Sequence, residues 1–367
     1  MPERIVIKEI CEVYDGPHAT PKKTVDGPVY LGIDAITDDG KIDAKEFAHL
    51  SEEDYIKWTK RVTPQYGDIV FSYEATLGRY ALIPKDFYGC LGRRLAIIRN
   101  ISDDIDTLWL YYYFLSPEWK QFIQSKVIKG STVNRISVED FPTYTVPNIS
   151  INVQHNIANI LSKIDKKVAL NNNINDNLEQ QAYLIFENMM AKAEAHRLKG
   201  KYIEAKFLTS VITGKEDANF SVPNGKYKFF TCSNKPLYCN SYAFDTSSIL
   251  IAGNGDFNVK HYSGKFNAYQ RTYVLTPKKE YFALLYLASL YRINSFKSSS
   301  SGSIVKFITK SDVENIPVFI PDDTAYLDEL NKLLLAQEQN SLENELLVQL
   351  RDWLLPMLMN CQATIAD

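Results

Sequence analysis

A heptad pattern occupies the middle of the chain. Apolar residues and amides recur there at alternating spacings of four and three, as in a helix that packs against another helix. The positions are Ile157, Leu161, Ile164, Val168, Asn171, Asn175, Leu178, Ala182, Ile185 and Met189. A second helical pattern, from about residue 323 to Met359, includes Leu327, Leu330, Leu334, Leu346, Leu350, Trp353 and Met357. The sequence therefore predicts two long helices, and Pro356 is expected to kink or end the second one.

Both helical patterns turn polar midway. The first contains NNNINDN at 171–177 and the second QEQNS at 337–341. If the helices pair, amides buried between them would fix their register and orientation at some cost in stability. The same side chains could instead lie in solvent, and the sequence leaves both interpretations open.

The chain repeats itself at about half its length, which points to a duplicated unit. Residues 130–140 (GSTVNRISVED) align with 302–312 (GSIVKFITKSD), and a short strand follows each copy, ending at Pro147 and at Pro321. Three further pairs match in the same order: the aromatic-rich helical runs 108–115 and 281–290, the strands 92–98 and 269–275, and the strands 67–72 and 247–253. The shared order predicts two similar domains.

These patterns divide the chain into four parts. We expect one globular domain at 1–149, a long helix with a linker at 150–199, a second globular domain at 200–321 and a second long helix at 322–367. The expected fold class is α+β, with two similar α/β domains, two long antiparallel helices that form a coiled coil, and a pseudo-twofold internal repeat.

Composition and charge narrow the class of protein. Apolar residues make up 45% of the chain and charged residues 23%, as in ordinary globular domains. Five cysteines without a CxxC pair and five scattered histidines support neither a zinc site nor a disulfide framework. The longest apolar stretches are too short for a membrane span, so we expect a cytoplasmic protein. The net charge is −3, but residues 322–367 carry −7, which leaves a mild positive excess on the preceding residues and permits a nucleic-acid surface.

Catalytic motifs are weak. The sequence contains no Walker, GxGxxG, HExxH or GxSxG motif and no amino-methyltransferase signature. Residues 253–255 (Gly-Asn-Gly) favour a turn over a phosphate-binding loop, and Glu204 with Lys206 favours a solvated charge pair over a nuclease site. A stand-alone enzyme with a divergent motif is therefore the weaker hypothesis.

Both halves share loops that are rich in Lys, Arg, Asn, Gln, Ser and Thr, the side chains that contact phosphates and base edges. Each residue alone has an ordinary explanation as a solvated side chain, but matched loops in both halves favour DNA binding. The candidates in the first half are Lys22, Lys23, Arg79, Arg93, Arg94, Lys129, Ser131, Thr132, Asn134 and Arg135. Those in the second half are Lys215, Asn254, Asn258, Lys260, Asn267, Gln270, Arg271, Lys297, Ser299, Ser300, Ser303 and Lys306, the last five within a run at 296–306 that is expected to be a loop.

The chain resembles the specificity subunit of type I restriction-modification systems over essentially its whole length. The segments that carry the resemblance are GDIVFSYEATLG at 67–78, GSTVNRIS with Pro147, the helix at 170–189 and residues 231–275. Recognition loops are where such domains differ most, so no base contact is carried over. The second domain is shorter than the first and Pro356 interrupts the second helix, which puts the exact helix length in doubt.

The resemblance implies a non-catalytic reader of double-stranded DNA. Two target recognition domains would each read one half of a bipartite, asymmetric site, and the helices would set the gap and dock two methyltransferase (modification) subunits. Restriction (translocase-nuclease) subunits would join the complex. No catalytic residue, metal or cofactor is expected on this chain, and S-adenosylmethionine, ATP and Mg would bind the partner subunits. The helix positions assigned to pairing and partner contact are Ile157, Leu161, Ile164, Val168, Leu178, Ile185, Leu334, Leu346, Leu350 and Trp353. The alternative is a coiled-coil adaptor that organises partner proteins without reading a sequence.

Overall fold

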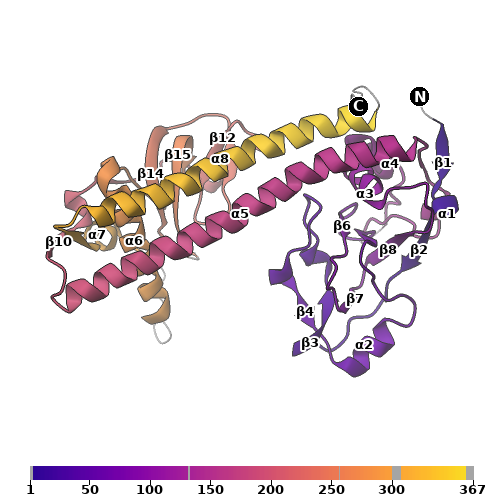
Figure 1. Ribbon diagram of the computed structural model, residues 1–367, viewed down its shortest axis with the longest axis horizontal. Helices are drawn as coiled ribbons and strands as arrows, with labels where there is room; N and C mark the ends of the chain where they lie inside the picture. The colour runs from indigo at the N-terminus through magenta and orange to yellow at the C-terminus, as the bar shows by residue number, and fades with distance from the viewer. Residues whose placement is uncertain (1–2, 131–132, 256, 300–306, 361–367) are drawn as a thin grey trace. The chain divides into compact units, whose positions relative to one another are not determined.

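The computed structural model describes residues 3–130, 133–255, 257–299 and 307–360 (Figure 1). The chain divides into two compact units. Unit 1 comprises residues 1–167 and 347–367, and unit 2 comprises residues 168–346. Each unit therefore contains one globular domain and parts of both long helices.

Unit 1 contains a four-stranded antiparallel sheet of order β2-β8-β5-β6. The strands are β2 (Cys11–Asp15), β8 (Leu95–Asn100), β5 (Ile69–Ser72) and β6 (Tyr80–Leu82). A separate three-stranded sheet has the order β4-β3-β7, from β4 (Ala48–His49), β3 (Thr24–Leu31) and β7 (Gly89–Leu91). The first and last strands of the domain, β1 (Arg4–Val6) and β9 (Thr145–Pro147), pair antiparallel. This pairing closes the domain directly before the first long helix.

The aromatic run of unit 1 forms a buried helix. Asp106 caps it, because its carboxylate accepts hydrogen bonds from the backbone N–H groups of Leu108 and Trp109 at 2.7 and 2.9 Å. Trp119 on the next helix is fully buried and donates its indole N–H to the Tyr80 hydroxyl at 2.8 Å. The helices of this domain are α1 (Ile7–Ile10), α2 (Glu52–Trp58), α3 (Thr107–Leu115) and α4 (Pro117–Ser125).

Unit 2 contains a six-stranded sheet of order β11-β16-β14-β15-β12-β13. The strands are β11 (Val211–Thr213), β16 (Thr272–Leu275), β14 (Phe244–Ala252), β15 (Val259–Ala268), β12 (Tyr227–Phe230) and β13 (Leu237–Cys239). As in unit 1, the first and last strands pair antiparallel, here β10 (Gly200–Glu204) with β17 (Pro317–Pro321). The helices are α6 (Phe282–Ser299) and α7 (Lys310–Glu314), and Thr309 and Asp312 form a capping box at the start of α7.

The two domains share one sheet topology, which confirms the internal repeat. The order β2-β8-β5-β6 in unit 1 corresponds to β11-β16-β14-β15 in unit 2. The registers also correspond, since Ile69 pairs with Ile98 in unit 1 and Ile249 pairs with Leu275 in unit 2. The domains differ beyond this shared part, because β12 and β13 extend the sheet of unit 2 whereas β3, β4 and β7 form a sheet of their own. The helix α6 also continues to Ser299, so the expectation of a loop from residue 296 is wrong for its first residues.

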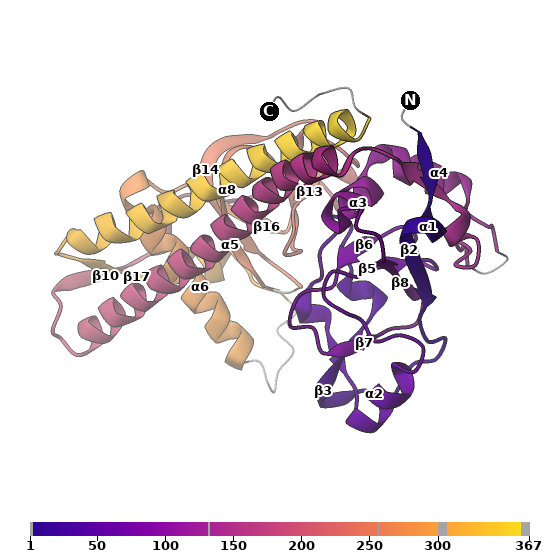
Figure 2. The same cartoon turned by 45° about the vertical axis from the view of Figure 1, so that its right-hand side comes forward.

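The long helices are α5 (Ile151–Glu194) and α8 (Ala325–Met359). Within unit 2, Asn171 contacts Asn344 and Asn175 contacts Ser341, so residue numbers fall along α8 as they rise along α5 and the helices pack antiparallel (Figures 1 and 2). Pro356 does not end α8: the helix continues to Met359, and the N–H of Asn360 bonds to the carbonyl of Pro356 at 3.0 Å.

The seam of α5 is confirmed where it is apolar. Ile157, Leu161, Ile164 and Val168 are buried, whereas Leu178 and Ile185 are half-buried. The helix pairing expected in the second half of α8 is wrong, whereas the partner contact assigned to the same residues stays a prediction. Although Leu334 is buried, Leu346, Leu350 and Trp353 are 58%, 44% and 58% exposed.

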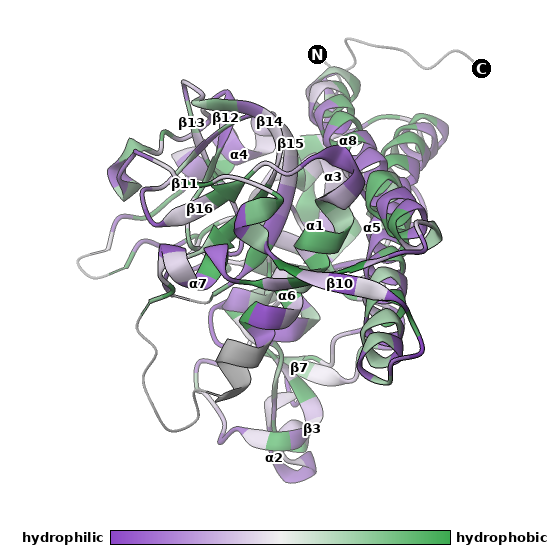
Figure 3. Ribbon diagram, turned by 90° about the vertical axis from the view of Figure 1, so that its left-hand side faces the viewer, coloured by the Kyte–Doolittle hydropathy of each residue, from purple (hydrophilic) through white to green (hydrophobic). Residues whose placement is uncertain are grey.

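The heptad of α8 instead continues through polar residues. Positions at spacings of four and three after Leu330 and Leu334 are Gln337, Ser341, Asn344, Val348, Arg351, Leu355 and Leu358. A search for leucines misses this register because its middle is hydrophilic. Leu346 and Leu350 are outside this register and lie on another face of α8. Figure 3 shows apolar and polar residues alternating along both long helices.

Candidate nucleic-acid interface

Loops from four parts of each domain meet beside the shared sheet. In unit 1, the N–H of Gly16 donates to the Leu95 carbonyl at 3.0 Å. The N–H of Tyr73 donates to the Arg94 carbonyl at 3.1 Å, and the N–H of Ile136 donates to the Tyr73 carbonyl at 2.7 Å. In unit 2, the N–H of Gly214 bonds to the Thr272 carbonyl, that of Gly253 to Arg271, and that of Ile308 to Gly253, at 3.1, 2.8 and 2.8 Å. The same three backbone bonds thus occur in both units at equivalent positions. We call the loops that these three bonds join, through five residues in each unit, the loop junction of that unit.

A glycine opens each loop junction because the backbone approaches too closely for a side chain. A Cβ atom on Gly16 would lie 2.4 Å from the Leu95 carbonyl oxygen, and one on Gly214 would lie 1.9 Å from the Ala268 carbonyl oxygen. Both distances are far below van der Waals contact, so these positions require glycine.

The loop junction of unit 1 brings several predicted residues together. Arg93 is exposed, and Arg94 adopts a left-handed φ of 75° that is unusual for a long side chain. The Nε atom of Arg94 lies 3.8 Å from a Glu74 carboxylate oxygen. Arg135 forms isolated β-bridges with Glu74 and with Ile128. The loop of Arg135 therefore lies beside the loop of Glu74. The exposed candidates on the loop of Arg135 are Lys129, Asn134 and Arg135.

The loop junction of unit 2 gathers Lys215, Asn254, Gln270 and Arg271. The backbone N–H of Gln270 bonds to the Glu216 carbonyl at 2.8 Å, so the loop of Lys215 lies beside it. A pocket of about 460 Å³ opens here, lined by Gly253, Gln270, Arg271, Tyr273, Phe307 and Ile308. The Tyr273 hydroxyl donates to the Ile308 carbonyl at 2.9 Å and fixes one wall of the pocket.

Other predicted residues serve the fold of their own domain. The Arg79 guanidinium contacts an Asp38 carboxylate at 2.6 Å and the Ile36 carbonyl at 3.0 Å. Asn267 is 2% exposed and its side-chain oxygen accepts the N–H of Ala268. Because it is enclosed, Asn267 has no access to a DNA surface in this conformation, which corrects its place among the candidates.

Lys260 and Asn258 hold the loop that follows β12. The Lys260 ammonium donates to the carbonyls of Thr231 and Ser233 at 3.3 and 2.6 Å, and Asn258 donates to the Cys232 carbonyl at 2.8 Å. Burial lowers the pKa of Lys260 to about 8. Both residues therefore act on the loop rather than presenting a free side chain.

The remaining candidates lie on the loop after Gly16, at the end of α6, or outside the described residues. Lys22 and Lys23 are exposed on the loop that leaves Gly16. Lys297 and Ser299 belong to the last turn of α6, of which only the backbone is described. Ser131, Thr132, Ser300, Ser303 and Lys306 lie outside the described residues. Glu204 and Lys206 form the expected charge pair, with both side chains more than 40% exposed.

Unit 2 also carries a basic and aromatic surface that the sequence analysis missed. Lys228 lies 4.5 Å from the ring centre of Tyr262, and Lys265 lies 4.9 Å from that of Tyr242. The Tyr242 ring is in turn 5.0 Å from that of Tyr227. Lys265 and Tyr242 are exposed and suit a nucleic-acid backbone and bases, whereas Lys228 is only 20% exposed and pairs with Glu345. The alternation KYK at 226–228 is the sequence signal that could have identified this surface.

The polar residues of the long helices pair across the helix interface within unit 2. The Asn171 amide donates to a Glu343 carboxylate oxygen at 2.7 Å and to the Asn344 side-chain oxygen at 2.9 Å, and Asn171 is 1% exposed. Asn175 donates to Ser341 at 3.1 Å. Of the two interpretations that the sequence left open, the buried amide is therefore correct for Asn171, whereas the contact of Asn175 with Ser341 is exposed.

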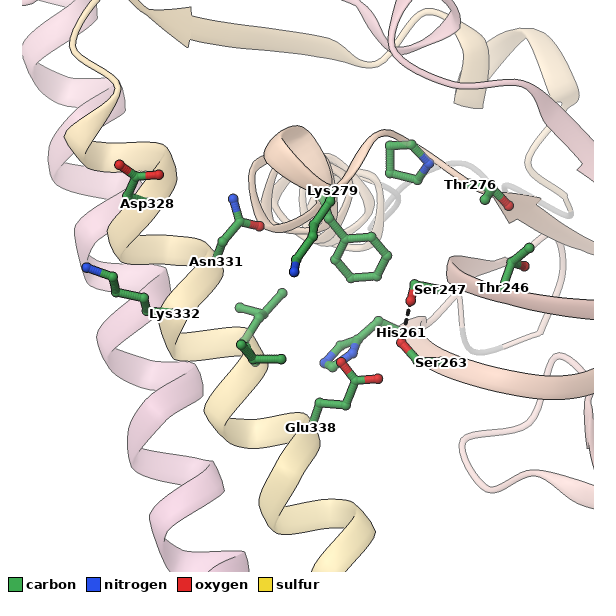
Figure 4. A pocket seen from close by; sticks show the side chains of 14 residues that line it. Thr246, Ser247, His261, Ser263, Thr276, Lys279, Asp328, Asn331, Lys332 and Glu338 are labelled. Carbon is green, nitrogen blue, oxygen red and sulfur yellow. Dashed lines mark hydrogen bonds between the residues drawn. The ribbon is translucent and has the colours of Figure 1, made fainter.

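A larger pocket of about 660 Å³ in unit 2 lies between β14, β15, the start of α6 and the first half of α8 (Figure 4). Ser263 donates to Ser247 at 2.7 Å, while the His261 ring contacts the Gln337 side chain at 3.3 Å. Burial lowers the pKa of His261. The two serines thus pair with each other and the imidazole with an amide, so this arrangement is not a serine–histidine pair of the kind that activates a nucleophile.

Over residues 3–130, 133–255, 257–299 and 307–360, no cluster of three or more His, Cys, Asp or Glu side chains could hold a metal ion. Across those same ranges, every helix is too short or too polar to cross a membrane.

Comparison with known proteins gives the family. A family model described as the type I restriction modification DNA specificity domain matches residues 3–180 and 189–344. The chain is 38% identical over 171 residues to the type I restriction enzyme EcoDI specificity subunit of Escherichia coli. That match spans 45% of this chain and 38% of the relative, so less than half of the relative's length is covered.

The fold has a solved counterpart. The crystal structure of a type I restriction-modification system S subunit from M. genitalium matches with a TM-score of 0.58 and 16% identity, covering 97% of this chain and 95% of that one. At this identity the likeness concerns the fold, and it agrees with the duplicated domains and long helices described above. With the family model matching both halves, the chain belongs to the type I restriction modification DNA specificity domain family.

Proposed function

We propose that this chain is the DNA sequence-specificity subunit of a type I restriction-modification complex. It reads a bipartite, asymmetric site on double-stranded DNA and directs adenine methylation or cleavage by partner subunits. The observation that carries the proposal is the loop junction, which the two family domains build with the same backbone bonds but different side chains. One scaffold with two sets of side chains suits two unlike half-sites, because sequence is read by side chains at base edges.

Phosphate contacts would come from the exposed lysines around each loop junction. Lys22 and Lys23 extend from the first loop of unit 1, and Lys215 from the corresponding loop of unit 2. Such contacts position a protein on DNA without selecting a sequence. The exposed Lys265 beside Tyr242 adds a second region of this kind in unit 2.

The chemistry belongs to partner subunits in this proposal. Two methyltransferase subunits bind S-adenosylmethionine, and restriction subunits bind ATP and Mg, while this chain contributes no catalytic group. The large apolar residues that α8 leaves exposed suit a protein partner. In unit 1 they are Leu350 and Trp353, and in unit 2 Leu335, Leu342 and Leu346.

Methylation of a random duplex library tests the proposal. The library and S-adenosylmethionine are incubated with the chain and a type I modification subunit that co-purifies with it, with that subunit alone, and with the chain alone. We expect adenine methylation only when both proteins are present, confined to one bipartite motif. Methylation without sequence preference would support the adaptor alternative, and methyl transfer by the chain alone would support a stand-alone enzyme.

A further inference from the structure

In each loop junction, one backbone carbonyl belongs to an arginine, Arg94 or Arg271, and the residue directly before that arginine occupies the same place in both units. Arg93 precedes Arg94 in unit 1, and Gln270 precedes Arg271 in unit 2. The strand that follows pairs in the same register in both, since Leu95 faces Ser72 and Thr272 faces Ala252. Positions 93 and 270 are therefore structurally equivalent.

Their backbones are held while their side chains are free. The N–H of Arg93 donates to the Tyr30 hydroxyl at 3.1 Å, and the N–H of Gln270 donates to the Glu216 carbonyl at 2.8 Å. Both side chains are exposed, and within the described part of the chain neither has a hydrogen-bond or ion-pair partner. A fixed backbone with an unpaired polar tip is what a group that reads a base edge needs.

Arg135 and Arg271 also have exposed side chains on a hydrogen-bonded backbone, but their equivalents in the other unit, Phe307 and Arg94, present no free polar group. Other neighbouring polar residues lack the combination. Arg94 lies against Glu74, and Arg79 is held by Asp38 and a backbone carbonyl. The Lys260 ammonium donates its hydrogen bonds to backbone carbonyls of the neighbouring loop. In unit 2, Gln270 also lines the 460 Å³ pocket of the loop junction, so this residue lies at a concave part of the surface.

The two side chains differ in the base that they suit. An arginine fork donates two hydrogen bonds to O6 and N7 of guanine, whereas a glutamine amide donates to N7 and accepts from N6 of adenine. Resting on the proposed function, we infer that Arg93 and Gln270 are equivalent specificity-determining residues, Arg93 selecting a guanine in one half-site and Gln270 an adenine in the other.

Reciprocal substitutions test this inference in the complete complex with its methyltransferase. The complexes carry Arg93→Gln or Gln270→Arg, and the readouts are selection from a random duplex library and the methylated motif. For Arg93→Gln we expect one guanine of one half-site to change to adenine, with binding to the original site weakened at least about tenfold. For Gln270→Arg we expect the opposite change, in the other half-site alone.

Two further variants make the result decisive. Arg93→Ala should relax the preference at the same single position, which keeps the test open if Arg93→Gln binds too weakly to select a motif. Lys129→Gln, an exposed basic residue of the same unit, should weaken binding evenly with no change of motif. A wild-type complex that selects a bipartite motif, with Arg93→Gln and Arg93→Ala leaving every preference intact, would overturn this inference and spare the proposed function. A wild-type complex with no bipartite motif would overturn the proposed function itself.

Discussion

At the scale of single residues, Arg351 links the two long helices within unit 1. Its guanidinium lies 2.9 Å from Asp165 on α5, and the Tyr112 hydroxyl donates to the other oxygen of the same carboxylate at 2.7 Å. The side chains of Arg351 and Asp165 are only 13% and 22% exposed. Removing one member of such a pair leaves a charge without its partner in a poorly solvated place.

We therefore expect Arg351→Ala to lower the free energy of unfolding of the full chain by about 2 to 3 kcal/mol. The control is Lys166→Ala, an exposed residue one position beyond Asp165, which should change stability by less than about 0.5 kcal/mol. Denaturant unfolding measures both variants. Equal losses in the two would show that the pair contributes nothing of its own.

His261 predicts a response to acid. Its ring packs against Tyr286 and Phe282, with centroid separations of 4.9 and 6.2 Å, and burial lowers its pKa while Gln337, Glu338 and Glu179 raise it in part. Because the folded-state pKa is below the unfolded value, the unfolded chain binds more protons once the pH falls through the unfolded pKa. The stability associated with neutral His261 is present above that pKa and is lost on acidification.

Between pH about 7.5 and about 5.5, wild type should thus lose more stability than His261→Asn. The matched control is His196→Asn, an exposed histidine whose positive φ asparagine tolerates. Unfolding midpoints at the two pH values give the comparison. If His261→Asn is as acid-sensitive as wild type, His261 is not a source of the effect.

At the scale of elements, the amide layer between α5 and α8 has a measurable energy. Asn171→Ala would leave the Asn344 side-chain oxygen without its donor, and we expect a loss of about 1 to 2 kcal/mol. Replacing both partners, Asn171→Leu with Asn344→Leu, should cost less than the single change, because the Asn344 oxygen is removed together with its donor and the Glu343 carboxylate, which also loses that donor, is only half-buried. The free energy of unfolding of the full chain, measured for each variant, distinguishes these cases. An Asn171→Ala variant as stable as wild type would show that the Asn171 amide contributes no more than a solvated side chain does.

The exposed apolar residues of α8 predict where a partner docks. In unit 1, Leu350→Glu with Trp353→Glu should leave the unfolding midpoint unchanged, since both side chains lie in solvent, yet weaken association with the methyltransferase at least about tenfold. Phe207→Glu, at a 72% exposed residue away from α8, is the control and should bind as wild type does. Co-purification or calorimetric titration measures the association. Unchanged binding by the α8 variant would exclude this face of the helix from docking.

The sequence predicted elements best where their cores are apolar. The heptad of α5 is continuous through Ile157, Leu161 and Ile164, and these residues are buried as expected. On α8 the seam passes through Gln337, Asn344 and Arg351, and periodicity of apolar residues carries no information about such positions. Of the two effects expected of Pro356, an end to α8 is wrong, because a proline near a helix end removes one backbone bond and the remaining turn can still form.

At the scale of the whole molecule, the duplication was readable because it preserves strand patterns in order. The shared sheet order and the matching registers of β5 with β8 and of β14 with β16 confirm it. The loop junctions were not readable, because backbone hydrogen bonds leave little trace in a sequence beyond Gly16 and Gly214. For the same reason composition placed Asn267 among the DNA candidates, although the fold of β15 encloses it.

The central claim, that each domain reads one half of the site independently, is tested most directly by exchanging one domain. Residues 1–149 are replaced by the corresponding domain of another family member whose motif is known, and long-read sequencing records the methylated motif of the resulting complex. The account predicts that one half of the motif becomes that of the donor, while the other half and the gap between them stay as in wild type. A motif that is unchanged, or one in which both halves change, would contradict it.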